Sequence, residues 1–210
     1  MIPLKPLTRP ATILFLVWGC APSVGAAATT YAVVEAKSST RIHVGKSGAF
    51  SFAGHKHEVE APVSGTVTAD SANLPGSSVA LTFPTARMRV LAEGEPKGDA
   101  PKVEEAMHGP KVLNVARFPE ISFMSKKVTG KALGGSGYDL SLVGDLSLHG
   151  VTREITVPVR VTIEGRILTA TGEATILHDQ FGMERVSVFG GAVKVKNEIG
   201  ISFRIVAEQR

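Results

Sequence analysis

The sequence predicts an all-β fold, a single antiparallel β-barrel of about eight strands with one short helical insertion. Two observations in the second half of the chain predict it. Long segments carry apolar residues at alternate positions, and short polar turns join these segments. Successive side chains of a strand point to opposite faces, so each segment has one apolar face, and closing such strands into a barrel leaves no exposed sheet edge.

The alternation is clearest in four consecutive segments. Residues 151–163 have apolar side chains at the odd positions except Arg153, and a short turn follows at residues 164–166. The other three segments with the same two-residue period are residues 138–148, 168–176 and 197–207. Each is predicted to be a half-buried strand.

The first half is also rich in strand signals but is less regular. Residues 31–35 and 41–44 are short strand candidates, and a longer strand is expected over residues 57–68. Residues 70–76 are predicted to form a turn, because asparagine, proline and glycine cluster there. The alternation resumes at residues 79–83.

Between residues 91 and 118 the alternation stops. Residues 101–107 are expected to begin a short helix with Pro101 in its first turn, and a second helical turn is expected around residues 111–116. This stretch has too few apolar residues for a core of its own. We therefore interpret it as an insertion across one end of the barrel.

The first 28 residues have the order of a secretory signal peptide. Lys5 and Arg9 precede an apolar run at residues 11–21, and small residues follow. We therefore expect residues 29–210 to form one barrel domain in the periplasm, with no mature transmembrane segment. Cys20 is the only cysteine and ends a stretch that loosely resembles a lipoprotein processing box, so acylation of Cys20 is the alternative to cleavage.

Charge and motifs argue against nucleic acid and against catalysis. The chain has 23 basic and 19 acidic residues, and Lys5 and Arg9 of the leader account for half of the net charge of +4. The sequence has no Gly-x-Ser-x-Gly motif, no glycine-rich phosphate loop and no cysteine beyond the leader. We expect a protein that binds no nucleic acid and is not an enzyme.

Histidines offer one route to a different function. His55 and His57 would point to the same side of a strand and could share a metal ion. The remaining histidines are His43, His108, His149 and His178. Because no cysteine, acidic cluster or metalloprotease motif accompanies them, we interpret residues 55–57 as a surface turn and expect no metal site.

Small residues on one inward face indicate space inside the barrel. Ala170, Gly172 and Ala174 alternate along a single strand. An eight-stranded barrel is just wide enough to be filled by side chains or to hold one small ligand. Two interpretations stay open: the space is a cavity, or facing phenylalanines fill it and the glycines let the sheet coil.

Three ordered blocks resemble the YceI family. They are Phe118-Pro119-Glu120-Ile121-Ser122-Phe123, residues 144–155 and Asp179-Gln180-Phe181-Gly182-Met183. The resemblance implies an exported, lipocalin-like barrel that binds polyisoprenoid or similar lipids in an internal apolar tunnel. The chain departs from the family's pattern at residues 101–108, at His149 and at residues 178–182, positions that bear on the polar end of the ligand.

The resemblance and the residues together predict an exported lipid-binding protein. It would enclose a polyisoprenoid or similar long-chain amphiphile, for carriage or storage, by burial of the chain away from water. No cofactor is required; the bound molecule would be an isoprenoid or an isoprenoid quinone. The predicted wall residues are Phe52, Phe83, Phe123, Leu140, Leu142, Ala170, Gly172, Ala174, Phe181 and Phe203.

Two alternatives belong to other functional classes. In the first, the protein assists electron transfer in the envelope, holding an isoprenoid quinone for a b-type membrane cytochrome. In the second, the barrel is packed solid and acts as a stress-related interaction module through residues 91–116. No feature of the sequence predicts an oligomeric state.

Overall fold

The computed structural model describes residues 28–47, 56–93, 95–188 and 193–210 of the 210-residue chain. Most of the predicted leader with Cys20, together with Phe52 and His55, lies outside these residues. The described residues are mostly strands, with one α-helix and short 3-10 helices. None of the helices in the described ranges is long and apolar enough to cross a bilayer.

The elements follow one another along the chain with short connections. The strands are β1 Thr29–Val33, β2 Ser39–Ser47, β3 His57–Glu60, β4 Ser64–Ala69, β5 Ser78–Pro84, β6 Arg89–Val90, β7 Glu120–Gly134, β8 Gly137–Leu148, β9 Val151–Glu164, β10 Ile167–Leu177, β11 Ser187–Val188 and β12 Val193–Gln209. The helices are α1 Ala100–His108 and the 3-10 turns η1 Glu35–Lys37, η3 Leu74–Gly76, η4 Thr85–Arg87 and η5 Asp179–Phe181.

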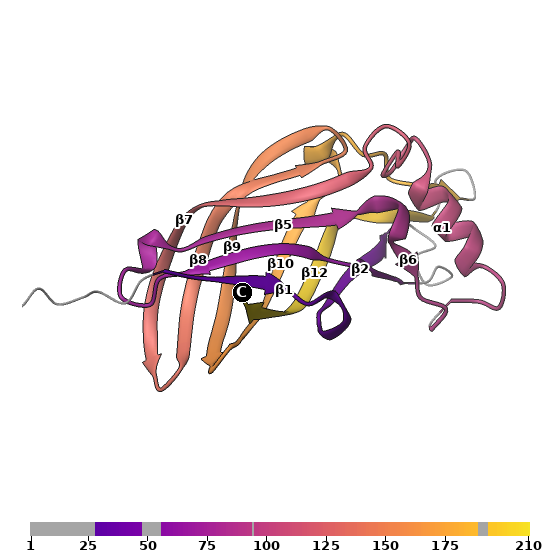
Figure 1. The fold of residues 1–210 in the computed structure, drawn as a ribbon. Coiled ribbons are helices and arrows are strands. Elements are labelled where there is room, and N and C mark those ends of the chain that lie inside the picture. Colours follow the sequence, from indigo (N-terminus) through magenta and orange to yellow (C-terminus); the bar gives the residue numbers. More distant parts are fainter. Residues whose placement is uncertain (1–27, 48–55, 94, 189–192) are drawn as a thin grey trace, which may run out of the picture.

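Eight strands close into an antiparallel barrel, in the order β1-β4-β5-β7-β8-β9-β10-β12 (Figure 1). The ring closes where β1 pairs with the end of β12, with Tyr31 opposite Gln209 and Val33 opposite Ala207. The sequence prediction of a single barrel of about eight strands is therefore confirmed. Helix α1 lies at one end of the barrel, away from the β7–β8 hairpin (Figure 1).

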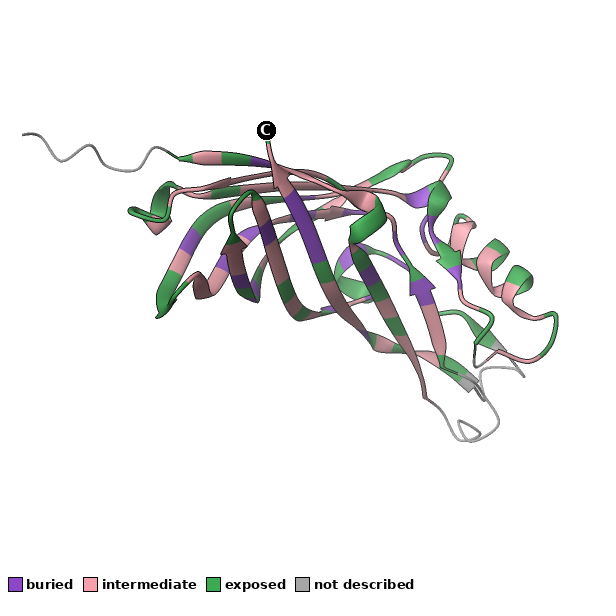
Figure 2. Cartoon of the chain, turned by 60° about the horizontal axis from the view of Figure 1, so that its bottom comes forward, coloured by how far each residue is buried: buried purple, intermediate pink, exposed green. Residues whose placement is uncertain are grey.

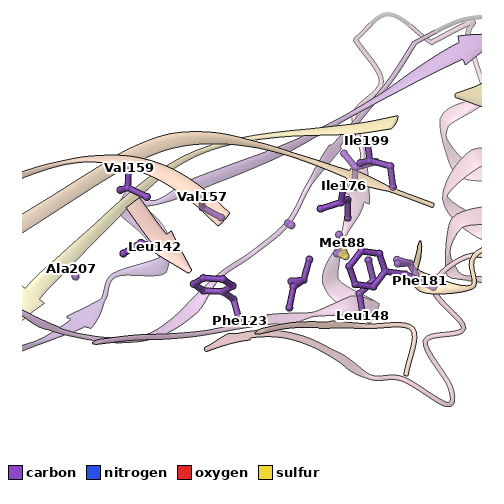
Figure 3. Close-up of a cluster of buried hydrophobic side chains, with 14 of the residues drawn as sticks. Met88, Phe123, Leu142, Leu148, Val157, Val159, Ile176, Phe181, Ile199 and Ala207 are labelled. Carbon is purple, nitrogen blue, oxygen red and sulfur yellow. The ribbon is translucent and has the colours of Figure 1, made fainter. Parts of the chain in front are cut away.

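The predicted alternation is visible in the burial of the strands (Figure 2). Along β9, Val157, Val159 and Val161 are buried while Pro158 and Arg160 between them are exposed. The buried side chains of opposite walls converge in the interior (Figure 3). The tight β8–β9 turn has His149 and Gly150 at positive φ, 51° and 76°.

Strand β12 has two partners on one edge. Its residues 194–204 pair with β2, with Phe203 opposite Thr40, and its last residues pair with β1. Beyond β2 the sheet continues through β3 to β6. This extension enlarges the wall at the end of the barrel where α1 contacts β6.

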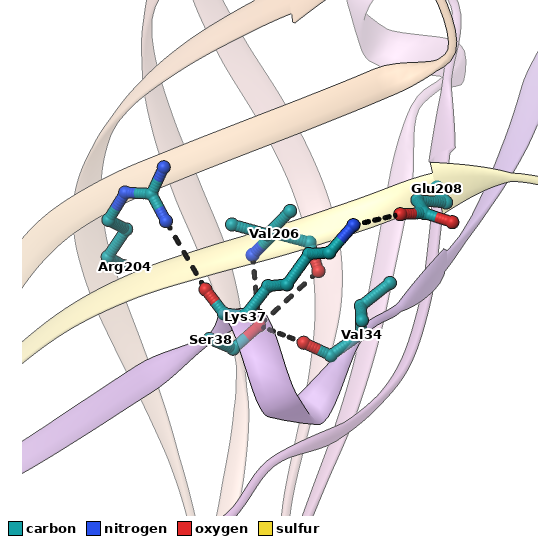
Figure 4. Close-up of polar contacts among 6 residues, drawn as sticks. All are labelled: Val34, Lys37, Ser38, Arg204, Val206 and Glu208. Carbon is teal, nitrogen blue, oxygen red and sulfur yellow. Dashed lines mark hydrogen bonds and ion pairs between the residues drawn. The ribbon is translucent and has the colours of Figure 1, made fainter.

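Ser38 bridges the point where β12 changes partner (Figure 4). The Val206 amide donates to Ser38 Oγ at 3.0 Å, and Ser38 Oγ donates to the carbonyl oxygen of Val34 at 2.9 Å. Beside it, Lys37 Nζ lies 2.7 Å from Glu208 Oε1. The serine hydroxyl thus satisfies a backbone amide that neither β1 nor β2 reaches, as a buried N–H requires.

The prediction of one strand over residues 57–68 is wrong. The chain forms β3 and β4, which have different neighbours: β3 pairs with β2 and β6, whereas β4 pairs with β1 and β5. The break falls at Pro62, which has no N–H for a ladder hydrogen bond. In β4, Gly65 has φ +144° and lies so close to β5 that an added Cβ would be 2.1 Å from the Ala80 carbonyl oxygen.

Two smaller differences concern element ends. The last strand begins at Val193, before the expected residue 197, and its pairing with β2 shifts register between Val195 and Ile199. The predicted helix is α1, with Pro101 in its first turn. Residues 111–116 form hydrogen-bonded turns rather than a helical turn, with Asn114 at φ 49°.

Candidate ligand-binding cavity

The barrel encloses an apolar cavity. Its volume, counted for the centres of water-sized molecules, is about 200 Å³. An apolar cavity of about 150 Å³ holds a benzene molecule, so this space is large enough for several carbons of a ligand chain. The interior is therefore hollow over part of its length.

The wall is built from the inward residues of strands around the barrel. Strands β8, β9, β10 and β12 contribute Leu142, Leu146, Leu148, Ile155, Val157, Val159, Ala170, Ala174, Ile176, Ile199, Ile201, Phe203 and Ile205. The remaining wall strands, β2 to β5 and β7, contribute Thr40, Ile42, Val44, Val59, Val67, Val79, Leu81, Phe83, Ile121 and Phe123.

The two ends of the cavity are built differently. Toward the β7–β8 hairpin, Tyr31, Val128, Val161, Leu168 and Ala207 are all at most 8% exposed and belong to the same hydrophobic cluster, but they do not line the space. This packed layer closes the inner end.

At the other end the insertion covers the barrel. Met107 of α1 and Val112 and Leu113 of the following turns line the cavity. His178 and Met183, on either side of η5, line it as well. The insertion is thus part of the cavity wall.

Six of the predicted wall residues line the cavity: Phe83, Phe123, Leu142, Ala170, Ala174 and Phe203. Leu140 packs against the hydrophobic cluster without lining the space, and Phe181 is fully buried in that cluster. Phe52 lies outside the described residues. As ligand contacts, all ten remain predictions.

The glycines do not leave open space. A Cβ at Gly172 would lie 2.5 Å from the Pro158 carbonyl oxygen and 2.6 Å from Cζ of Phe203, which is opposite Gly172 on β12. A Cβ at Gly144 would lie 2.5 Å from the Met124 carbonyl oxygen and 2.7 Å from Phe123 Cζ. The phenylalanine rings fill the space above the glycines, as one interpretation of the small residues expected. Ala170 and Ala174 face the cavity, as the other interpretation expected.

Several lining residues were missed from the sequence, among them Thr40, Met88, Met107, Leu113 and Met183. The period of two along β2 could have indicated Thr40, since Ile42 and Val44 share its face. Leu113 lies on a turn, where no periodicity marks the buried side, and Met107 lies near the end of the nine-residue helix α1.

Only two polar side chains, Thr40 and His178, line the cavity among the described residues, and no Lys, Arg, Asp or Glu does. Burial lowers the pKa of His178, because desolvation disfavours the imidazolium. His178 Nδ1 donates to the Asn197 carbonyl oxygen at 3.3 Å. Thr40 is 4% exposed, and its Oγ1 has no hydrogen-bond partner in the described structure.

The described histidines make separate contacts. His43 Nδ1 and His57 Nδ1 each lie 2.6 Å from a carboxylate, that of Glu58 and that of Glu95. The His149 and Phe118 rings pack in a T-shaped arrangement, 5.0 Å between centroids. The part of the chain that the structure describes has no group of three or more residues that could hold a metal ion.

Comparison with known proteins identifies a matching family and relatives of similar sequence. The family model described as a YceI-like domain matches residues 31–207. A UPF0312 protein of Shewanella denitrificans is 43% identical over 54 residues, which is 26% of this chain and 26% of that protein. A UPF0312 protein of Yersinia pestis is 37% identical over 62 residues, 30% of each chain. The matched segments thus span less than a third of these relatives.

Solved structures share the fold at low sequence identity. Burkholderia cenocepacia BcnA superposes with a TM-score of 0.63 at 22% identity, over 83% of this chain and 98% of that chain. A structure described as a polyisoprenoid binding domain from Saccharophagus degradans superposes with a TM-score of 0.62 at 12% identity, over 87% of this chain and 99% of that chain.

Proposed function

Because this chain belongs to the YceI-like domain family, we propose that it binds a polyisoprenoid or similar long-chain lipid inside its barrel. The observation that carries the proposal is the apolar cavity, closed at its inner end and covered by the insertion at the other. The Saccharophagus relative is described as polyisoprenoid binding, a chemistry that fits such a wall.

The size of the cavity gives the scale of the affinity. On the scale on which a cavity of about 150 Å³ holds the six carbons of benzene, this cavity holds about eight carbons of a chain. At about 0.8 kcal/mol per buried methylene, these carbons contribute about 6 kcal/mol. Association costs at least about 4 kcal/mol, so tight binding of a longer lipid needs further apolar contacts along the rest of its chain.

The proposed role is binding rather than catalysis, with carriage or storage of the lipid in the periplasm. Export is supported by the leader-like order of residues 1–28 alone. An isoprenoid quinone would use the same cavity, with a b-type membrane cytochrome as the partner. The cavity argues against the packed barrel, and the residues of the insertion that line the cavity argue against a separate interaction module there.

A series of straight-chain alcohols of increasing length tests the proposal. Each alcohol is titrated against a neutral fluorescent naphthylamine dye bound to the detergent-free protein. We expect each added methylene to raise the affinity about fourfold until about eight carbons are reached, and then a plateau where the cavity is full. Affinity that does not depend on chain length would contradict the proposal.

A further inference from the structure

The chemistry of the cavity wall restricts the polar end of the ligand. Of the residues that the structure describes, thirty line the cavity, and Thr40 and His178 are the polar ones among them. A buried charge without a partner is far more costly than a buried neutral polar group. A carboxylate or phosphate drawn inside would meet no lysine or arginine on the described part of this wall.

Thr40 is the polar group with an unmet hydrogen bond. Its residue is 4% exposed, and its Oγ1 is buried without a partner in the described structure. The backbone around it is satisfied, since its carbonyl oxygen accepts from the Ala61 amide at 3.0 Å. A buried hydroxyl left unpaired destabilises the fold, so its presence calls for a physical explanation.

The position of Thr40 is near the inner end of the cavity. It lies opposite Phe203 of β12, whereas His178 is held to residue 197 of the same strand. At a strand rise of about 3.3 Å per residue, residues 203 and 197 of β12 are roughly 20 Å apart along the strand, and Thr40 and His178 are separated accordingly. Rotation about the Cα–Cβ bond of Thr40 exchanges its methyl and hydroxyl groups between staggered positions, and this can present the hydroxyl to a ligand.

We propose that the cavity selects an uncharged amphiphile, and that its hydroxyl, phenol, amide or quinone group hydrogen-bonds Thr40 Oγ1. This inference rests on the proposed lipid-binding function and specifies the ligand class. The burial that lowers the pKa of His178 keeps that side chain neutral near pH 7, so it supplies no charge for an anionic head.

Three ligands with one carbon skeleton test it: farnesol, farnesyl phosphate and the hydrocarbon farnesene, each competing with the neutral dye. We expect farnesol to bind about 3- to 10-fold tighter than farnesene, the effect of one neutral hydrogen bond. Farnesyl phosphate should bind at least about 100-fold more weakly than farnesol.

Variants assign the preference to Thr40. Thr40→Val should abolish the preference for farnesol over farnesene while farnesene still binds, and Thr40→Ser should keep the preference. Thr171→Val is the matched control, because Thr171 is an exposed strand threonine. If Thr40→Val fails to fold, the comparison of Thr40→Ser with Thr40→Ala provides the same contrast.

Three results would overturn the inference. Equal binding of all three ligands would contradict selection against charge. An unchanged preference for farnesol in Thr40→Val would contradict the hydrogen bond to Thr40. Lipid binding itself would stand in both cases. Loss of the preference in His178→Phe alone would place the polar group at the other end. Failure of every ligand to displace the dye would contradict the lipid-binding function itself.

Discussion

Ala174→Phe is the change that fills the cavity most directly. Ala174 lines the space on β10 and lies opposite Ile201, another lining residue. Phenylalanine adds about six carbons to the side chain, which occupy volume that the ligand chain would fill. At about 0.8 kcal/mol per excluded carbon, binding should weaken by about 5 kcal/mol, between about 1,000-fold and 10,000-fold.

The fold should survive this change because the ring enters open space. Overpacking costs about 1–3 kcal/mol in a filled core, and the cavity should keep the cost toward the lower end. The assay is dye displacement by a farnesol-sized alcohol, with circular dichroism and urea unfolding to verify the fold. Thr171→Phe, on the same strand but exposed to solvent, is the control and should bind normally. Normal affinity in a folded Ala174→Phe protein would refute the assignment of the cavity as the binding site.

Three further predictions concern stability. Ser38→Ala should lower the free energy of unfolding in urea by about 1–2 kcal/mol, because the buried Val206 amide loses its acceptor, whereas Ala at the exposed Ser71 should change little. Gly172→Ala should destabilise by about 1–3 kcal/mol, since its Cβ would lie 2.5 Å from the Pro158 carbonyl oxygen and 2.6 Å from the Phe203 ring, whereas Gly137→Ala has its nearest atom at 3.7 Å and should cost less. Because burial lowers the pKa of His178 from 6.5, the unfolded state takes up the proton first, so stability should fall as pH drops below about 6.5; in His178→Gln, urea unfolding from neutral to mildly acidic pH should show a smaller loss.

The fold was largely predictable because half-buried strands carry a two-residue period. Strands β8, β9, β10 and the second half of β12 have polar residues on the solvent face and apolar ones inside, so each could be assigned without knowing its neighbour. The break at Pro62 was missed because Val59, Ala61, Val63 and Val67 keep the same alternation through it. Periodicity reports which face is buried, but it does not report where a strand changes partner.

The site was only partly predictable for a related reason. Small residues at 170 and 174 indicated space, but whether a facing ring fills it depends on register between strands, as at Gly172 and Phe203. Thr40 was not predicted, because a threonine on a strand is expected to face water, although the two-residue period that it shares with Ile42 and Val44 places it on the inner face.

The most direct test of the account is the mass of the protein as the cell makes it. The chain would be expressed with its own leader, purified without detergent, and measured in native and denaturing mass spectra with lipid extraction. The account predicts an added mass in the native spectrum that is lost on denaturation and extracts as an uncharged isoprenoid. A protein of bare polypeptide mass that also takes up none of the supplied alcohols would contradict it.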